Sequence, residues 1–119
     1  MGIEIKDFSG AGYKPMIDYG DWRVALIGYD DRLSRENLKK SECHGETDEV
    51  FILLVGNASL YIGKDGKEMT EYRLEPGKLY NVKCGTWHAI SMEKGAKVAV
   101  VENRDTSAHN TEYYFFEKI

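Results

Sequence analysis

The sequence has few of the residues that carry metal or thiol chemistry, with three histidines and two cysteines among 119 residues. It also lacks an excess of positive charge, because 16 Lys and Arg stand against 20 Asp and Glu, for a net charge of −4. Domains that bind nucleic acid or anionic membranes typically present a basic surface. We therefore expect neither a nucleic acid nor a membrane among the partners of this protein.

Long apolar runs are also missing. The longest, residues 50–55, is far shorter than the ~20 residues of a membrane-spanning helix. The N-terminal residues lack the apolar core of a secretory signal, and two cysteines without such a signal are typical of reduced thiols in a cytoplasm. We therefore expect a cytoplasmic protein in which Cys43 and Cys84 are unpaired and fill small apolar spaces.

What the sequence does contain is a repeated alternation of apolar and polar residues. The chain length and the hydrophobic content of 42% are those of a globular domain, so we expect residues 1–119 to form a single domain. Turn residues separate eight short extended runs roughly every 8–12 residues, which is typical of a β-sandwich or barrel. The predicted strands are 22–29, 49–55, 58–62, 68–74, 79–82, 87–92, 97–101 and 113–116. Only 31–40 favours a helix, with Ser34 as its N-cap.

Two segments place residues that can bind a metal at the starts of strands. They are 42–49, Glu-Cys-His-Gly-Glu-Thr-Asp-Glu, and 83–88, Lys-Cys-Gly-Thr-Trp-His. Alternate residues of a strand share a face, so Glu42 and His44 point the same way if extended, and Glu49 heads an apolar row. A buried carboxylate costs several kcal/mol unless it is paired or bound to a cation. A divalent metal offsets this cost and gives each imidazole a partner.

The same segments resemble the two sequence motifs of the cupin superfamily. The first motif is G, five residues, H-x-H, three or four residues, E, six residues, G. The second is G, five residues, P-x-G, two residues, H, three residues, N. The residues that match at the correct spacing are His44, Glu49 and Gly56 in the first motif, and Gly77, Gly85 and His88 in the second. The resemblance covers residues 40–103 or so. The family's leading glycine, first histidine, proline and final asparagine are replaced by Glu36, Glu42, Lys83 and Met92.

The resemblance implies an all-β, double-stranded β-helix (jelly-roll) barrel with at most one short helix. It also implies a divalent Fe, Mn, Ni or Zn ion held by His44, Glu49, His88 and, on position alone, Glu42. The alternative is a degenerate cupin in which these residues only form hydrogen bonds, and the departures at positions 42 and 83 favour it. Glu42 is equally well explained as a solvated charge facing Lys39 or Lys40.

Two functions follow from this resemblance. One is a metal-dependent enzyme acting on a small polar molecule, its reaction open; the other is a non-catalytic small-ligand binding or sensor module. We predict ligand contacts from Tyr80, Glu102 and Arg104, although 102–105 also fits a simple turn. A sugar phosphate is disfavoured, because Lys83 and Arg104 are the only cations expected near the motifs.

Two further expectations concern the outside of the molecule. His109, within the polar stretch 106–110, is expected at the surface. Short cupins resemble many that pair through added strands, so we predict a homodimer that associates through 22–29 and 113–116.

Overall fold

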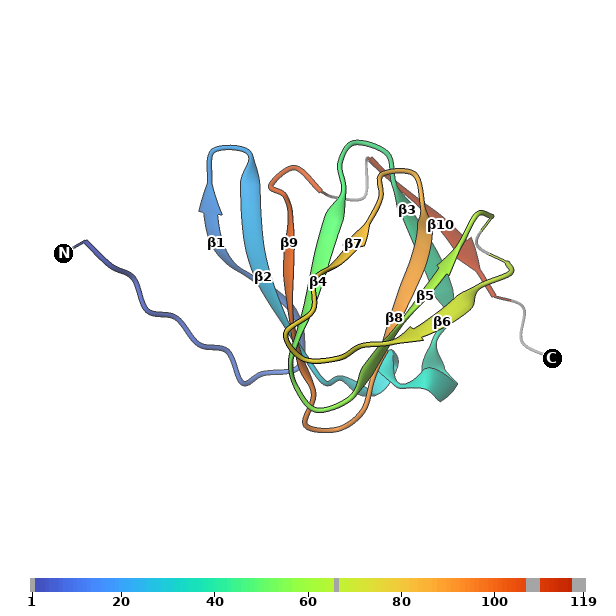
Figure 1. Ribbon diagram of the computed structural model, residues 1–119, viewed down its shortest axis with the longest axis horizontal. Helices are drawn as coiled ribbons and strands as arrows, with labels where there is room; N and C mark the ends of the chain where they lie inside the picture. The colour runs from blue at the N-terminus through green and yellow to red at the C-terminus, as the bar shows by residue number, and fades with distance from the viewer. Residues whose placement is uncertain (1, 66, 107–109, 117–119) are drawn as a thin grey trace.

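Two five-stranded antiparallel sheets face each other in a barrel (Figure 1). The computed structural model describes residues 2–65, 67–106 and 110–116. Within them, the first sheet has the order β1 (Gly12–Tyr19), β2 (Trp22–Gly28), β9 (Lys97–Asn103), β4 (Glu49–Val55), β7 (Tyr80–Val82). The second has the order β10 (Thr111–Phe115), β3 (Lys40–His44), β8 (Trp87–Met92), β5 (Ala58–Gly63), β6 (Thr70–Arg73). The all-β, jelly-roll prediction is confirmed.

The described residues contain no α-helix over 31–40, so that prediction is wrong. Residues Asp31–Leu33 and Arg35–Asn37 form two separate 3-10 turns, η1 and η2. The intervening Ser34 is extended, at φ −67° and ψ 151°, and its side chain does not cap the second turn but donates to the Asp31 carbonyl oxygen of the first at 2.9 Å. With two apolar residues in ten, this segment has no continuous apolar face to bury, and a short helix depends on such burial. No helix in the described part of the chain is long and apolar enough to cross a membrane.

Strand β4 shows why the barrel interior has a polar end. Glu49, Phe51 and Leu53 are buried, at 7%, 4% and 2% exposure, while the residues between them are only partly buried. The carboxyl of Glu49 therefore enters the interior at the head of an apolar row. The pairing register with β9 shifts between Leu53 and Val55, which is the effect of a β-bulge, and Val55 turns outward to 53% exposure.

The turn that ends β4 depends on Gly56. Its φ is +82°, a conformation that is costly for other residues. A Cβ atom here would also lie 2.6 Å from the Cα of Ala96. Gly56 thus allows the β4–β5 turn to pack against the β8–β9 turn and closes one end of the barrel.

Candidate metal centre

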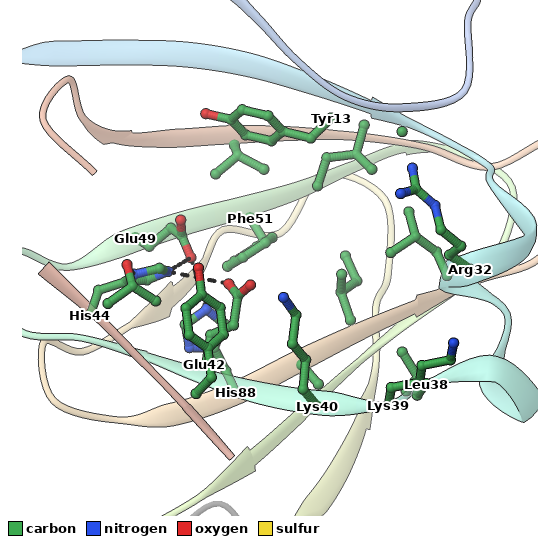
Figure 2. A pocket seen from close by; sticks show the side chains of 18 of the residues that line it. Tyr13, Arg32, Leu38, Lys39, Lys40, Glu42, His44, Glu49, Phe51 and His88 are labelled. Atoms are coloured by element: carbon green, nitrogen blue, oxygen red, sulfur yellow. Dashed lines mark hydrogen bonds and ion pairs between the residues drawn. The ribbon is translucent and has the colours of Figure 1, made fainter. Parts of the chain in front are cut away.

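Three strands bring the four residues predicted as metal ligands together at one end of the cavity (Figure 2). Glu42 and His44 lie on β3 and point the same way, as their spacing predicts. His88 lies on the neighbouring β8, and its Cα is the partner of Glu42 in the β3–β8 register. Glu49 comes from β4, in the opposite sheet. The cluster therefore joins the two sheets.

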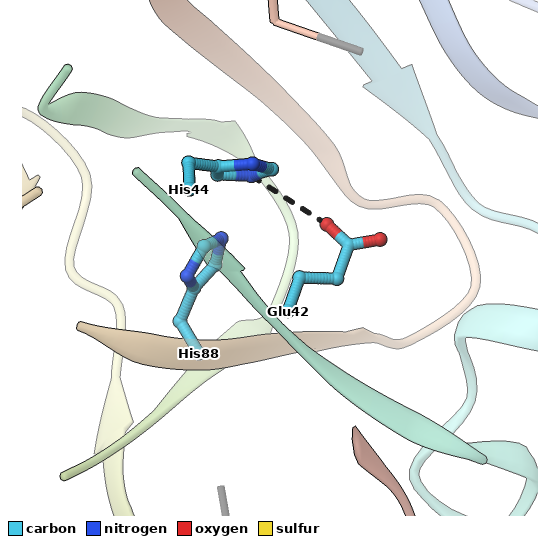
Figure 3. Close-up of side chains that lie close together, drawn as sticks. All are labelled: Glu42, His44 and His88. Carbon is cyan, nitrogen blue, oxygen red and sulfur yellow. Dashed lines mark ion pairs between the residues drawn. The ribbon is translucent and has the colours of Figure 1, made fainter. Parts of the chain in front are cut away.

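The ligand atoms converge on a small volume. One nitrogen from each imidazole and one oxygen of Glu42 lie within 4.8 Å of one another (Figure 3). His44 Nε2 is 3.6 Å from Glu42 Oε2 and 3.6 Å from Glu49 Oε1, and His88 Nε2 is 3.0 Å from Glu49 Oε1. Ligands about 2.1 Å from one cation stand about 3.0–3.4 Å apart in regular geometries. The arrangement therefore fits a single divalent ion.

Both imidazoles are oriented through their Nδ1 atoms. His88 Nδ1 lies 3.2 Å from the carbonyl oxygen of Thr86, which accepts only, so Nδ1 carries a proton and Nε2 is the ring nitrogen that faces Glu49 and would bind a metal once it has lost its own proton. His44 Nδ1 lies 2.8 Å from the hydroxyl of Thr111 on β10. Such hydrogen bonds fix the ring orientation and tautomer of metal-binding histidines.

Burial and pairing oppose each other at His88 and Glu49. Burial alone lowers the pKa of His88, but the hydrogen bond to Glu49 and the attraction of its charge outweigh burial, and the net pKa is raised. Burial likewise raises the pKa of Glu49, but the hydrogen bonds with His88 and Glu102 and the attraction of the two histidines together outweigh burial, and the net pKa is lowered. The two residues therefore form a buried ion pair in the metal-free protein.

Glu102 adds a second buried carboxyl beside Glu49. It is 6% exposed, and it forms a hydrogen bond with Glu49. Burial first, and then Glu49, raise the pKa of Glu102 to about 8. On its other side, the Tyr13 hydroxyl donates to Glu102 Oε2 at 3.0 Å, and Arg23 Nη1 lies 3.9 Å from the same oxygen. Glu102 thus lies in the cavity wall, and its contact with a ligand stays a prediction.

The cavity has a volume of about 860 Å³. The candidate ligands form one end. Apolar side chains from both sheets also line it, among them Ile27, Phe51, Ile90 and Val100. Arg32 and Lys39 lie toward the other end, and Lys40 lies between them and Glu42 (Figure 2). This volume accommodates a small molecule.

The other predicted ligand contacts lie away from this wall. Neither Tyr80 nor Arg104 lines the cavity. The Tyr80 hydroxyl accepts a hydrogen bond from the Glu75 backbone N–H at 2.9 Å. Arg104 is exposed, and its carbonyl oxygen accepts from Arg23 Nη2 at 2.8 Å.

Both cysteines are unpaired, as expected. Cys43 is buried, in line with a small apolar filler, whereas Cys84 is exposed, so its predicted packing role is wrong. A turn position after β7 gives the Cys84 side chain little to pack against. His109 lies outside the described residues.

The sequence analysis missed three cavity cations: Arg32, Lys39 and Lys40. A pattern was present for Lys40, because it stands two and four residues before Glu42 and His44 and shares their face once β3 is recognised as a strand. Arg32 and Lys39 offered no such pattern. They line the cavity because η1 and the approach to β3 pass its rim.

Searches among family models and curated proteins found no match. Solved structures do match. A cupin-2 domain containing protein from Shewanella frigidimarina is 22% identical with a TM-score of 0.55, and the match covers 82% of this chain and 85% of that one. A protein from Bacillus halodurans is 14% identical, with a TM-score of 0.64 and coverage of 84% and 75%. The Fe(II) form of HppE is 19% identical, with a TM-score of 0.60 and coverage of 86% and 60%.

These likenesses, together with the two facing sheets, show that the chain has the cupin fold. Within that fold it carries a group of residues that could hold a metal ion, Glu42, His44 and His88.

Proposed function

We propose that this protein binds one divalent metal ion through His44, His88, Glu49 and Glu42 and binds or transforms a small polar molecule in the adjoining cavity. The observation that carries the proposal is the group formed by Glu42, His44 and His88, whose ligand atoms lie within 4.8 Å of one another. Glu49 adjoins this group, 3.6 Å from His44 Nε2 and 3.0 Å from His88 Nε2. Such a set suits Fe(II), Mn(II), Ni(II) or Zn(II).

Two further features support this proposal. The hydrogen bonds at both Nδ1 atoms leave Nε2 directed at the cluster. The structurally similar HppE contains Fe(II) and has been solved in complex with substrate. When bound, a divalent ion would supply Lewis-acid polarisation of a ligand oxygen or activation of water or dioxygen. The residues of this chain would orient the ligand and exclude water.

The test is metal content. Protein purified without an affinity tag is analysed by elemental mass spectrometry, as isolated and after incubation with Fe(II), Mn(II), Ni(II) or Zn(II) and removal of free ions. We expect about one ion per chain with at least one metal. The variants His44→Ala and His88→Ala should lose it, while Lys94→Ala, at an exposed turn residue, should retain it. Absence of metal under every condition, or full occupancy in His88→Ala, contradicts the proposal.

The second candidate function is a non-catalytic binding or sensor module. The observation that favours it is the 3.0 Å pair between His88 and Glu49, because it satisfies both buried charges without a metal. The replacement of the family's first histidine by Glu42 also favours the non-catalytic function. In this case the metal-free protein binds its ligand with full affinity, and the elemental analysis separates the two functions.

A further inference from the structure

The cavity separates its charges along its length. The carboxyl groups of Glu42, Glu49 and Glu102 gather with the two histidines, Lys40 follows beside Glu42, and Lys39 and Arg32 lie toward the opposite end (Figure 2). Apolar side chains line the rest of the cavity. A cavity of this kind discriminates among ligands by where they carry charge.

Lys40 is the cation best placed to contact a ligand. Its ammonium group points into the cavity in Figure 2 and lies 4.2 Å from the centre of the Tyr113 ring. The ion pairs of the described residues include none for Lys40, although Glu42 is only two positions away on β3. Glu42 is instead 3.6 Å from His44. The aromatic ring therefore holds the Lys40 side chain in place and leaves its charge without a carboxylate.

Arg32 and Lys39 differ in how far a carboxylate balances their charge. The guanidinium of Arg32 bonds Asp30 twice, through Nε at 3.1 Å and Nη2 at 2.9 Å. Its charge is largely balanced, but Nη1 keeps donors for a ligand. Lys39, like Lys40, has no carboxylate partner among the ion pairs of the described residues. Two unbalanced ammonium groups thus border the cavity.

We propose that the ligand of this cavity is a small organic anion, whose carboxylate or phosphoryl group binds Lys40 with help from Lys39 and Arg32. Its apolar body contacts the apolar side chains that line the cavity, and its far end is directed at the cluster of Glu42, His44 and His88. This last part rests on the proposed metal site, whereas anion binding at Lys40 does not. The three cavity cations also correct the expectation that Lys83 and Arg104 are the only cations near the motifs.

Three probes that carry the same propyl chain test the proposal: butanoate, propylphosphonate and the uncharged butanamide. Binding is measured by NMR titration at millimolar probe concentration, on metal-free protein and on protein incubated with Zn(II). We expect at least one anion to bind about tenfold more tightly than butanamide. The preference should weaken as salt is raised, because an exposed ammonium is screened.

Variants at position 40 test whether the anion binds Lys40. Lys40→Met keeps the aliphatic stem and should reduce the anion to the affinity of butanamide, while Lys40→Arg should retain the preference. Lys94→Met, which removes an equally exposed lysine from a turn, should change nothing. Equal binding of all three probes, no binding of any, or an unchanged preference in folded Lys40→Met overturns the proposal. Anion preference without metal uptake contradicts only the proposed function, and metal uptake without anion preference contradicts only this inference.

Discussion

At the scale of single residues, the contact between Glu49 and Glu102 has the clearest energetic consequence. Two carboxyl groups joined by a hydrogen bond in a buried wall share one proton, because burying a second charge there is costly. Glu102 is then the donor to Glu49 and the acceptor for Tyr13. A neutral amide at position 102 preserves both hydrogen bonds.

We therefore predict that Glu102→Gln leaves the free energy of unfolding of the metal-free protein nearly unchanged. Glu102→Leu should cost about 1–3 kcal/mol, because the Tyr13 hydroxyl loses its acceptor and Glu49 loses one of its donors. Urea denaturation followed by circular dichroism measures both values. A loss in Glu102→Gln as large as that in Glu102→Leu contradicts this account.

A second prediction at the scale of single residues concerns the carboxylate of Asp48. Its carboxylate accepts the Cys84 backbone N–H at 2.8 Å and the Asn81 side-chain amide at 3.1 Å, and these bonds lower the pKa of Asp48. A carboxyl with a lowered folded-state pKa stabilises fully above its unfolded value of about 3.9 and loses that contribution as the pH falls through the folded value. We expect the thermal midpoint of the wild type to fall more steeply below pH 4 than that of Asp48→Asn. Parallel curves would exclude a role for this carboxylate in acid sensitivity.

At the scale of elements, β10 supplies an orienting group to β3. Thr111 on β10 contacts His44 Nδ1 at 2.8 Å, and the two residues are partners in the β10–β3 register. Thr111→Val retains the branched shape without the hydroxyl. We expect it to weaken metal affinity about 10–100-fold with little change in stability, while Thr111→Ser retains affinity. Competition with a chromophoric chelator measures the difference, and unchanged affinity in Thr111→Val would show that β3 orients His44 unaided.

Two turns provide a matched pair of glycines. Gly56 and Gly77 have similar φ values, +82° and +84°, but an added Cβ meets Ala96 at 2.6 Å in the first and nothing within 4 Å in the second. We expect Gly77→Ala to cost about 1 kcal/mol from backbone strain alone. Gly56→Ala should cost more, roughly 3 kcal/mol, because the two turns must also separate. Equal losses in chemical denaturation would mean that the contact with Ala96 relaxes freely.

Strands with a buried apolar face could be predicted from the sequence, whereas strands without one could not. The bounds of β4 and β8 were predicted as they are found, because each has an apolar face. β1 and β3 were missed. β1 is an edge strand with Pro15 at a register shift, and β3, Lys-Ser-Glu-Cys-His, lines a polar cavity wall, so neither has the apolar alternation of a strand.

The residues of the candidate site were likewise predicted only in part. Motif spacing identified Glu42, His44, Glu49 and His88, because His44, Glu49 and His88 match family positions and Glu42 stands at the position of the first histidine. Only Glu49 and His88 stand on predicted strands. Lys40 was considered only as a partner of Glu42, and Arg32 not at all, because their place in the cavity wall depends on β3 and η1, neither of which was predicted.

At the scale of the whole molecule, association is the open prediction. Strand β10 lies at the edge of its sheet, with Phe115 66% exposed, and Trp22, which begins β2, is 45% exposed. Edge strands and exposed aromatic residues favour pairing with a second chain. We predict a homodimer at micromolar concentration, with twice the chain mass of 13.6 kDa by light scattering. Phe115→Asp should weaken it, and a wild-type monomer would contradict the prediction.

Strand β3 also sets a length scale for any ligand. Lys40, Glu42 and His44 project into the cavity from one strand, where alternate residues are about 6.8 Å apart. The polar side chains of this wall therefore start from evenly spaced backbone positions, while the lengths of the Lys40 and Glu42 side chains decide how close their charges come. A shorter side chain at either position, as in Glu42→Asp, would alter the length of ligand that reaches both groups.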